Sequence, residues 1–262
     1  MKPILRWTVG PCLQQGLDIL EESIKRTTEA LGFDNFDWAI CYNGLTSDQI
    51  DFVKKAKGNK PIFLIAQDWA NCPIPDNVQT PRRRDGSFEM NGTRCGGTLW
   101  KVCPARIRME SHEIVMDNDI IIRKKFPQID EFLVAKDKAL VLEEPVRFYG
   151  RYDCLFPPDS ANLNSGFMGF PPGYDFAKAI HKEWTNHGKY TQLRQDDEQG
   201  LLTYTLNLQP NIRIGKDQMR EILHREIGKD ITGEEEAYHF TQANRGINHR
   251  AWLYYKEKFI DE

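Results

Sequence analysis

The chain has 262 residues, of which 40% are hydrophobic and 11% aromatic, enough to build a sizeable core. Its formal net charge of −3 gives no global attraction to nucleic acid or to an anionic membrane, so any anion site must be local. No segment approaches the roughly 18 apolar residues of a membrane span. The N-terminus lacks the long apolar region of a signal peptide, and the six cysteines form no CxxC pair. We therefore expect free thiols and a cytoplasmic protein, and peripheral membrane association stays open.

The first third of the chain alternates apolar segments with helical periodicity. Strands are predicted at residues 4–9, 36–44 and 60–68, and helices at residues 17–32 and 46–58. Alternation at this spacing is typical of βαβ units, which build a mostly parallel sheet covered by helices on both faces.

Residues 69–97 lose this periodicity and contain many prolines and glycines. Long irregular segments in compact domains are usually functional or mobile. The arginines at 82–84 are interpreted as a solvated loop surface, with a basic lid over an anionic substrate as the alternative.

The remaining chain is predicted to form a short helix, further strands and three more helices, without a repeat or linker. The predicted short helix covers 97–111, the strands 113–116, 132–144, 147–156 and 163–170, and the later helices 174–188, 196–208 and 248–259. Glu143 and Glu144, at the end of one predicted strand, are interpreted as surface residues. One domain covering residues 1–262 is the simplest organisation.

The run "SHEIVMDNDIIIRKKF" places Asp117 and Asp119 at the end of an apolar strand. Residues two apart on a strand share a face, and Asn118 points to the other. Ligands collect at the carboxyl ends of parallel strands, and two neighbouring carboxylates favour a hard divalent cation such as Mg²⁺ or Mn²⁺. The alternative is a solvated turn between two strands. A haloacid-dehalogenase-type phosphatase is disfavoured, because its acid pair lies near the N-terminus and is followed by x-Thr.

The Asp-x-Asp pair belongs to a longer motif, "WKVCPARIRMESHEIVMDNDIII", and three further motifs follow it in the order "LNSGFMGF", "QDDEQGLLTYTL" and "YHFTQANRGINHRAW". These four motifs, in this order, resemble those of the metal-dependent nucleotide-sugar glycosyltransferases of the GT-A fold. Within that fold they look most like the retaining group of glycogenin and the lipopolysaccharide galactosyltransferases, called family 8. The resemblance implies that Arg106 lies near the diphosphate or nucleotide, and that Asp119 binds the metal. It implies further that Asp117 binds the metal or the ribose, with Asn118 beside it at the donor.

The second and third motifs are "LNSGFMGF" and "QDDEQGLLTYTL", which resemble the family's Asn-Ser/Ala-Gly strand and its "DQGLLN" segment. They imply that Asn164 faces the donor sugar, and that Glu198 or Asp197 orients the sugar or stabilises its anomeric carbon. Glu198 stands where the family has Asp. Without the resemblance, Asn164 is interpreted as a turn residue, and the acids equally as partners of a helix dipole.

The fourth motif, "YHFTQANRGINHRAW", resembles the family's C-terminal His-Phe/Tyr-x-Gly-x-x-Lys-Pro-Trp segment. It implies that His239 is the third metal ligand, although a lone histidine is usually a packed or surface residue. Gln242 replaces the glycine and the Lys-Pro is absent, so Arg245 and Arg250 are the candidates for holding the β-phosphate. Trp252 matches the tryptophan.

The resemblance implies an α/β fold: a single GT-A domain with a Rossmann-like, mostly parallel sheet and a smaller mixed acceptor-side sheet. Residues 1–119 would bind the nucleotide and residues 120–262 the acceptor. Thr8 and Asn43, at the ends of the first two predicted strands, are further candidate donor-binding residues. The implied activity is transfer of a sugar from a nucleoside diphosphate sugar, such as a UDP-sugar, to a hydroxyl acceptor with Mn²⁺ or Mg²⁺, with retention of configuration. A sugar nucleotidyltransferase and a catalytically silent nucleotide-sugar binding module are the alternatives.

Overall fold

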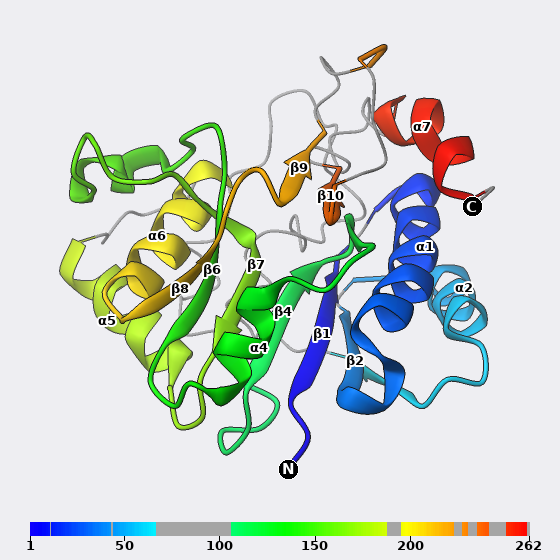
Figure 1. The fold of residues 1–262 in the computed structure, drawn as a ribbon, viewed down its shortest axis with the longest axis horizontal. Helices are drawn as coiled ribbons and strands as arrows, with labels where there is room; N and C mark the ends of the chain where they lie inside the picture. Colours follow the sequence, from blue (N-terminus) through cyan, green and yellow to red (C-terminus); the bar gives the residue numbers. More distant parts are fainter. Residues whose placement is uncertain are drawn as a thin grey trace.

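A seven-stranded sheet with helices packed around it dominates the structure (Figure 1). The computed structural model describes residues 1–10, 12–42, 44–66, 106–187, 195–222, 227–229, 235–240 and 250–260. The strand order is β3-β2-β1-β4-β7-β6-β8, so the chain crosses from β3 at one edge to β4 in the middle. This is the mixed α/β architecture that the sequence predicts.

The N-terminal part follows the prediction closely. Its elements are β1 (Ile4–Val9), α1 (Gln14–Leu31), the short 3₁₀ turn η1 (Phe33–Asn35), β2 (Asp37–Tyr42), α2 (Ser47–Lys57) and β3 (Ile62–Ala66). The three strands pair in parallel. Helix α2 begins with a capping box, in which Thr46 and Gln49 satisfy each other's backbone N–H groups. Helix α1 ends at Gly32, whose φ of 78° is unstrained only for glycine.

The middle of the sheet mixes parallel and antiparallel pairs. Strand β4 (Glu113–Asp117) pairs in parallel with β1 and antiparallel with β7 (Leu163–Phe170). Strand β6 (Ala139–Glu143) continues the sheet antiparallel to β7 and parallel to β8 (Asn211–Ile214). Asp117 therefore ends a central strand, in register with Thr8 of β1.

Two predicted strands differ from the structure, one in its first half and one throughout. Within 132–144, the first residues belong to helix α4 (Pro127–Val134), and only β6 is extended. The segment 147–156 contains the 3₁₀ helix η5 (Gly150–Leu155) instead of a strand. The described part of the predicted helix 97–111, residues 106–111, is turn and bend.

A second sheet of three short strands adjoins the large one. Strand β5 (Ile120–Ile122) follows β4 after a two-residue turn and pairs antiparallel with β10 (Ala237–His239). Strand β9 (Met219–Glu221) pairs in parallel with the other side of β10. Helix α7 (Arg250–Ile260) packs near α1 and buries Trp252 beside Phe240. The large and small sheets are thus joined by the segment that carries Asp117 and Asp119.

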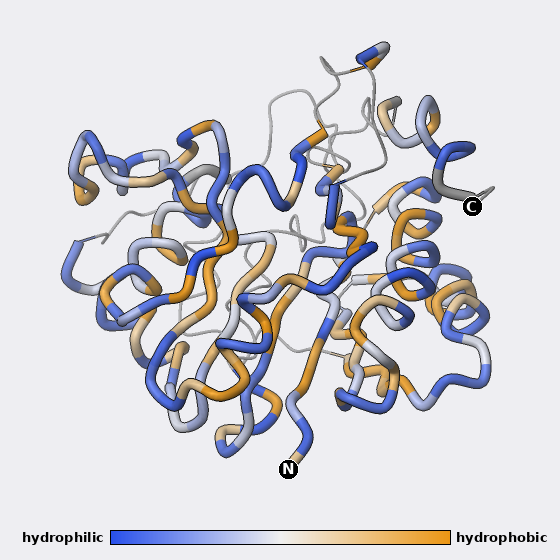
Figure 2. The backbone as a smooth tube through the Cα atoms, in the orientation of Figure 1, coloured by the Kyte–Doolittle hydropathy of each residue, from blue (hydrophilic) through white to orange (hydrophobic). Residues whose placement is uncertain are grey.

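Separate cores cover the two faces of the large sheet. Helices α1, α2 and α4 pack on one face, against side chains such as Leu5, Trp7 and Met116. Helices α5 (Phe176–His187) and α6 (Gln195–Asn207) pack with η5 on the other face. Figure 2 shows the hydrophobic colouring gathered along the central strands, as expected for a sheet buried on both sides. Among the described helices, none combines the length and apolar character that crossing a membrane requires.

Candidate functional site

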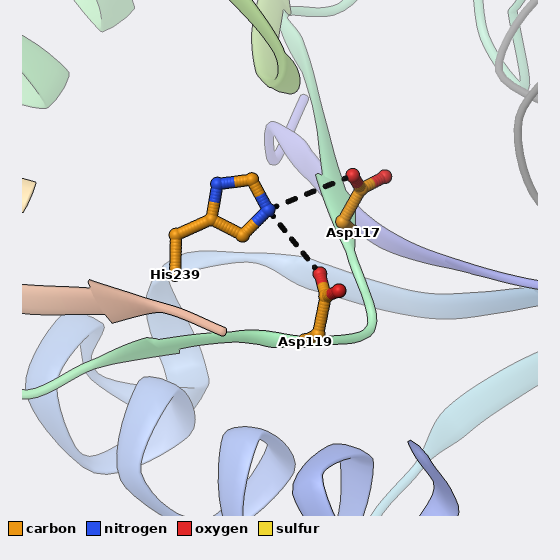
Figure 3. A group of neighbouring side chains, drawn as sticks. All are labelled: Asp117, Asp119 and His239. Atoms are coloured by element: carbon orange, nitrogen blue, oxygen red, sulfur yellow. Dashed lines mark ion pairs between the residues drawn. The ribbon is translucent and has the colours of Figure 1, made fainter. Parts of the chain in front are cut away.

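Asp117, Asp119 and His239 converge where β4 ends (Figure 3). One ligand atom from each residue lies within 4.8 Å of the other two. His239 Nε2 is 3.4 Å from Asp119 Oδ1 and 4.0 Å from Asp117 Oδ2. The three residues that the sequence predicts as metal ligands are thus brought together from β4, the turn after it and β10.

Backbone pairing places these side chains. His239 lies opposite Ile120 in the β5–β10 ladder, and the N–H of Phe240 donates to the carbonyl of Asp119 at 2.9 Å. On the other side, the hydroxyl of Thr8 lies 3.4 Å from Asp117 Oδ1. The predicted donor residue Thr8 therefore lies at the site and helps to orient Asp117.

The electrostatics of the site favour a cation. Burial lowers the pKa of the His239 ring, but contact with Asp119 and the charges of Asp117 and Glu221 outweigh it and raise the pKa above its ordinary value. Asp119 Oδ1 is shielded from solvent, and none of the described residues makes a well-aligned hydrogen bond with it. Two carboxylates and an imidazole are a donor set that divalent metals accept. The residues present fit a divalent ion, and their chemistry does not decide which one.

Gly166 of β7 forms a wall of this cluster. A Cβ atom at this position would lie 2.7 Å from Asn164 Oδ1, 2.8 Å from His239 Cε1 and 3.1 Å from Asp117 Oδ2. Any larger residue would displace the groups that face the candidate metal position. Glycine is therefore required here by close approach, and Asn164 lies beside the cluster.

A buried polar network extends from Asn164 away from the acids. Asn164 Oδ1 accepts from the N–H of Gly166 at 2.5 Å, while Asn164 Nδ2 donates to Glu144 Oε2 at 2.6 Å. Gln199 of α6 donates through Nε2 to the other oxygen, Glu144 Oε1. Glu144 is only 5% exposed, so its interpretation as a surface residue is wrong.

Glu144 is electrostatically unusual. Burial is the main cause that raises the pKa of its carboxyl group to about 8; Glu221 adds to the shift, and the Asn164 and Gln199 hydrogen bonds oppose it. A cation at the neighbouring acids would lower this pKa again, because positive charge favours the ionised form. Sequence reasoning missed both Glu144 and Gln199, although Gln199 falls inside a motif that matches the family.

The two predicted catalytic acids of α6 have different environments. Asp197 is fully buried and binds Arg151: Oδ1 accepts from its backbone N–H at 2.8 Å and Oδ2 from Nη2 at 2.6 Å. Both oxygens of Asp197 hold η5 against α6, so its predicted catalytic role is corrected to an anchoring one. Glu198 is 3% exposed and accepts from Ser165 Oγ at 3.5 Å. Glu198 thus contacts the residue between Asn164 and Gly166, and its role stays a prediction.

Arg106 does not lie at the acid pair. Its Nη1 donates to the carbonyls of Pro171 and Tyr174, each at 2.9 Å, and its Nε is 3.5 Å from Glu113. Glu113 begins β4 whereas Asp117 ends it, about 13 Å away at the usual rise of a strand. The predicted contact with the diphosphate is therefore wrong: Arg106 secures the opposite end of the strand.

The other predicted donor residues are only partly described. Asn118 lies in the turn after β4, is buried and donates to the carbonyl of Gly16 at 3.0 Å, so it faces α1 while the two acids face the cluster; its contact with the donor stays a prediction. Asn43 and Arg245 lie outside the described residues, as do Gln242 and the arginines at 82–84. Arg250 begins α7, but its side chain is not described.

Solved structures of glycosyltransferases have a similar fold. The chain superposes on the galactosyltransferase LgtC, solved with donor and acceptor sugar analogues, with a TM-score of 0.61 and 10% identity over 99% of this chain and 94% of that one. Mouse xyloside xylosyltransferase 1 gives 0.52 with 11% identity over 93% and 98% of the chains. The glycosyltransferase GlyE of Streptococcus pneumoniae TIGR4 gives 0.55 with 8% identity, over 98% of this chain and 60% of that one.

This chain has the GT-A fold. The predicted fold class and the resemblance to GT-A glycosyltransferases of the LgtC type are confirmed at the level of the fold. No protein-family model and no curated protein matches the sequence. At identities of about 10%, the superpositions carry no residue roles, so the GT-A site must be argued from its own geometry.

Proposed function

We propose that the chain is a divalent-metal-dependent glycosyltransferase that uses a nucleoside diphosphate sugar, with UDP-sugars as the first donor class to test. The convergence of Asp117, Asp119 and His239 at the carboxyl end of a central strand supports this proposal most strongly. In open α/β sheets this end of the strands is where ligands bind. Residues 1–119 would bind the nucleotide and residues 120–262 the acceptor.

The cation would supply Lewis-acid stabilisation to the departing diphosphate. The chain's own residues do the rest. Thr8 orients Asp117, and Gly166 leaves room beside His239 for the ion and donor. Asn164 and Glu198, which lie next to this space, would hold the sugar ring or stabilise the positive charge that develops at its anomeric carbon.

The resemblance implies retention of anomeric configuration, and we adopt that outcome as part of the proposal. An inverting enzyme would need a carboxylate acting as general base on the acceptor hydroxyl. Analysis of the product's anomeric configuration distinguishes the two outcomes. Arg245 and Arg250, in the segment after His239, are the proposed partners of the β-phosphate.

The test is donor binding and donor cleavage, with and without Mn²⁺ or Mg²⁺. A panel of nucleotide sugars is screened by thermal shift, because a ligand that binds the native state raises its stability. Donors that stabilise the protein are then assayed for release of the nucleoside diphosphate and the free sugar.

The variant Asp119→Asn should lose the metal-dependent shift and the turnover. Asp159→Asn, which removes the same charge from an exposed position after η5, should keep both. Full turnover by Asp119→Asn would overturn the proposal. Exchange of the nucleotide with pyrophosphate would instead indicate a nucleotidyltransferase.

A further inference from the structure

We propose that Glu144 is a positioning residue that fixes the amide of Gln199 with its carbonyl oxygen turned towards the substrate. The catalytic role of Glu144 rests on the proposed function. The orientation of the Gln199 amide rests on hydrogen bonds among three buried or half-buried side chains. Glu144, Asn164 and Gln199 come from the end of β6, from β7 and from α6, and meet beside the metal cluster.

The carboxylate of Glu144 has one amide partner on each oxygen. Its Oε2 accepts from Asn164 Nδ2 at 2.6 Å, and its Oε1 accepts from Gln199 Nε2. The backbone N–H of Glu144 donates to the carbonyl of Asn162 at 2.9 Å, which holds the residue where β6 ends. With a cation at the neighbouring acids Glu144 is ionised, and because an ionised carboxylate accepts hydrogen bonds and donates none, each amide must present its NH₂ group to it.

Both ends of the Asn164 amide are held by hydrogen bonds, whereas only the NH₂ end of the Gln199 amide is. The N–H of Gly166 donates to Asn164 Oδ1 at 2.5 Å, so this amide cannot turn without losing two hydrogen bonds. Gln199 has its NH₂ group on Glu144 and 3.4 Å from the carbonyl of Leu163. Within the described part of the chain, no donor is recorded for Gln199 Oε1. This oxygen is available to accept from a sugar hydroxyl or to face a positively charged anomeric carbon.

Replacing Glu144 by glutamine reverses this arrangement without changing the shape of the side chain. The new amide has one acceptor and one donor end, so it can satisfy only one of its two NH₂ neighbours. Because Asn164 is held by Gly166, Gln199 must turn its carbonyl towards position 144 and present NH₂ to the substrate. The variant Glu144→Gln therefore converts an acceptor into a donor at the site.

The pair also predicts a rescue. In the double variant Glu144→Gln with Gln199→Glu, the amide at 144 donates to one oxygen of the carboxylate at 199. The other carboxylate oxygen again faces the substrate as an acceptor, and the net charge of the pair is restored. The single variant Gln199→Glu sets two carboxylates against each other and should be the least active of the three.

The first measurement is steady-state donor cleavage. Glu144→Gln should lower kcat about 10- to 100-fold, with KM for the donor and Mn²⁺ affinity nearly unchanged, and the double variant should recover at least part of it. Glu143→Gln is the matched control, because it removes the neighbouring charge of β6, which pairs with the half-exposed Arg213. Wild-type kcat in Glu144→Gln, or no recovery in the double variant, would overturn the proposal.

A second measurement is independent of turnover. The side-chain NH₂ resonance of Gln199, assigned by its loss in Gln199→Ala, should exchange slowly with solvent in the wild type at saturating Mg²⁺, where Glu144 is ionised. In Glu144→Gln it should exchange at least about tenfold faster, since the NH₂ group then faces the open site. Unchanged exchange in that variant would refute the orientation, even if the chain proved to have another activity. Faster exchange in Glu144→Gln, together with no turnover by the wild type, would contradict the proposed function but leave the orientation of Gln199 intact.

Discussion

The variant Gly166→Ala tests whether the cluster at the end of β4 is a metal site. The added methyl group would lie 2.7 Å from Asn164 Oδ1 and 2.8 Å from His239 Cε1, where ordinary contact begins at 3.4 Å. Both neighbours must move by roughly half an ångström or more, at a cost of about 1–3 kcal/mol for overpacking. A displacement of this size at a metal ligand should weaken Mn²⁺ binding by at least about tenfold.

Gly169→Ala is the matched control on the same strand. Its added methyl group would lie 2.6 Å from Leu140 Cβ and 2.8 Å from Phe132 Cζ, in the hydrophobic core instead of the site. The steric cost is similar, so both variants should lower the melting temperature by roughly 2–10 °C. Only Gly166→Ala should lose metal affinity.

Calorimetric or paramagnetic titration with Mn²⁺ measures the affinity, and circular dichroism in EDTA measures the melting temperature. Wild-type Mn²⁺ affinity in Gly166→Ala would refute the assignment of the site. An equal loss of affinity in both variants would show that overpacking acts globally, and the reasoning from the three distances would then fail.

Three further predictions follow from the same contacts. Removal of Mn²⁺ with EDTA should lower the stability of the wild type by about 2.7 kcal/mol where Mn²⁺ was at a hundred times its Kd, and should leave the stability of Asp119→Asn unchanged. A shift of equal size in both proteins would contradict this. Arg151→Met should destabilise the fold by about 2–3 kcal/mol, because the fully buried Asp197 loses its charge partner; denaturant unfolding without a change would show that the pair contributes nothing. In metal-free protein the pKa of Glu144 is about 8, above its value in the unfolded chain. The folded state should therefore lose stability as the pH rises from about 5 to above 8, and Glu144→Gln should lack this loss. Profiles of melting temperature against pH that run parallel in the wild type and Glu144→Gln would refute the raised pKa.

The sequence predicts the large sheet well where the chain follows a regular period. Strands β1 to β3 and helices α1 and α2 have strong apolar periodicity and clear end signals, such as the Thr46 capping box and Gly32. The segment 132–144 was predicted as one strand because its apolar residues are continuous, but Pro127 at the first helical turn already indicates α4. The aromatic residues of 147–156 resemble a strand, whereas the Arg151–Asp197 ion pair holds them in the 3₁₀ conformation of η5.

The small sheet cannot be derived from periodicity. Its strands β5, β9 and β10 have three residues each, too few to distinguish alternation from a loop. Burial of Glu144 is equally invisible in the sequence. Its partners Asn164 and Gln199 lie 20 and 55 residues away, and only the pairing of β6 with β7 and the packing of α6 bring them together. The motif match predicts Arg106 at the diphosphate. In the structure it pairs instead with the buried Glu113 at the start of β4, which no local sequence pattern reveals.

The two carboxylates at the end of β4 repel each other and could also bind a divalent ion, and the topology explains both properties. Asp117 closes a strand of the large sheet, and two residues later Asp119 leads into β5 of the small one. His239 comes from β10, which pairs with β5. A divalent ion held by all three would therefore join the two sheets as well as bind a ligand, and repulsion between the two acids would become attraction to a shared charge. Because the ion would add contacts between the sheets beyond the two-residue turn and the hydrophobic core that they share, its stabilising effect should be largest for the small sheet.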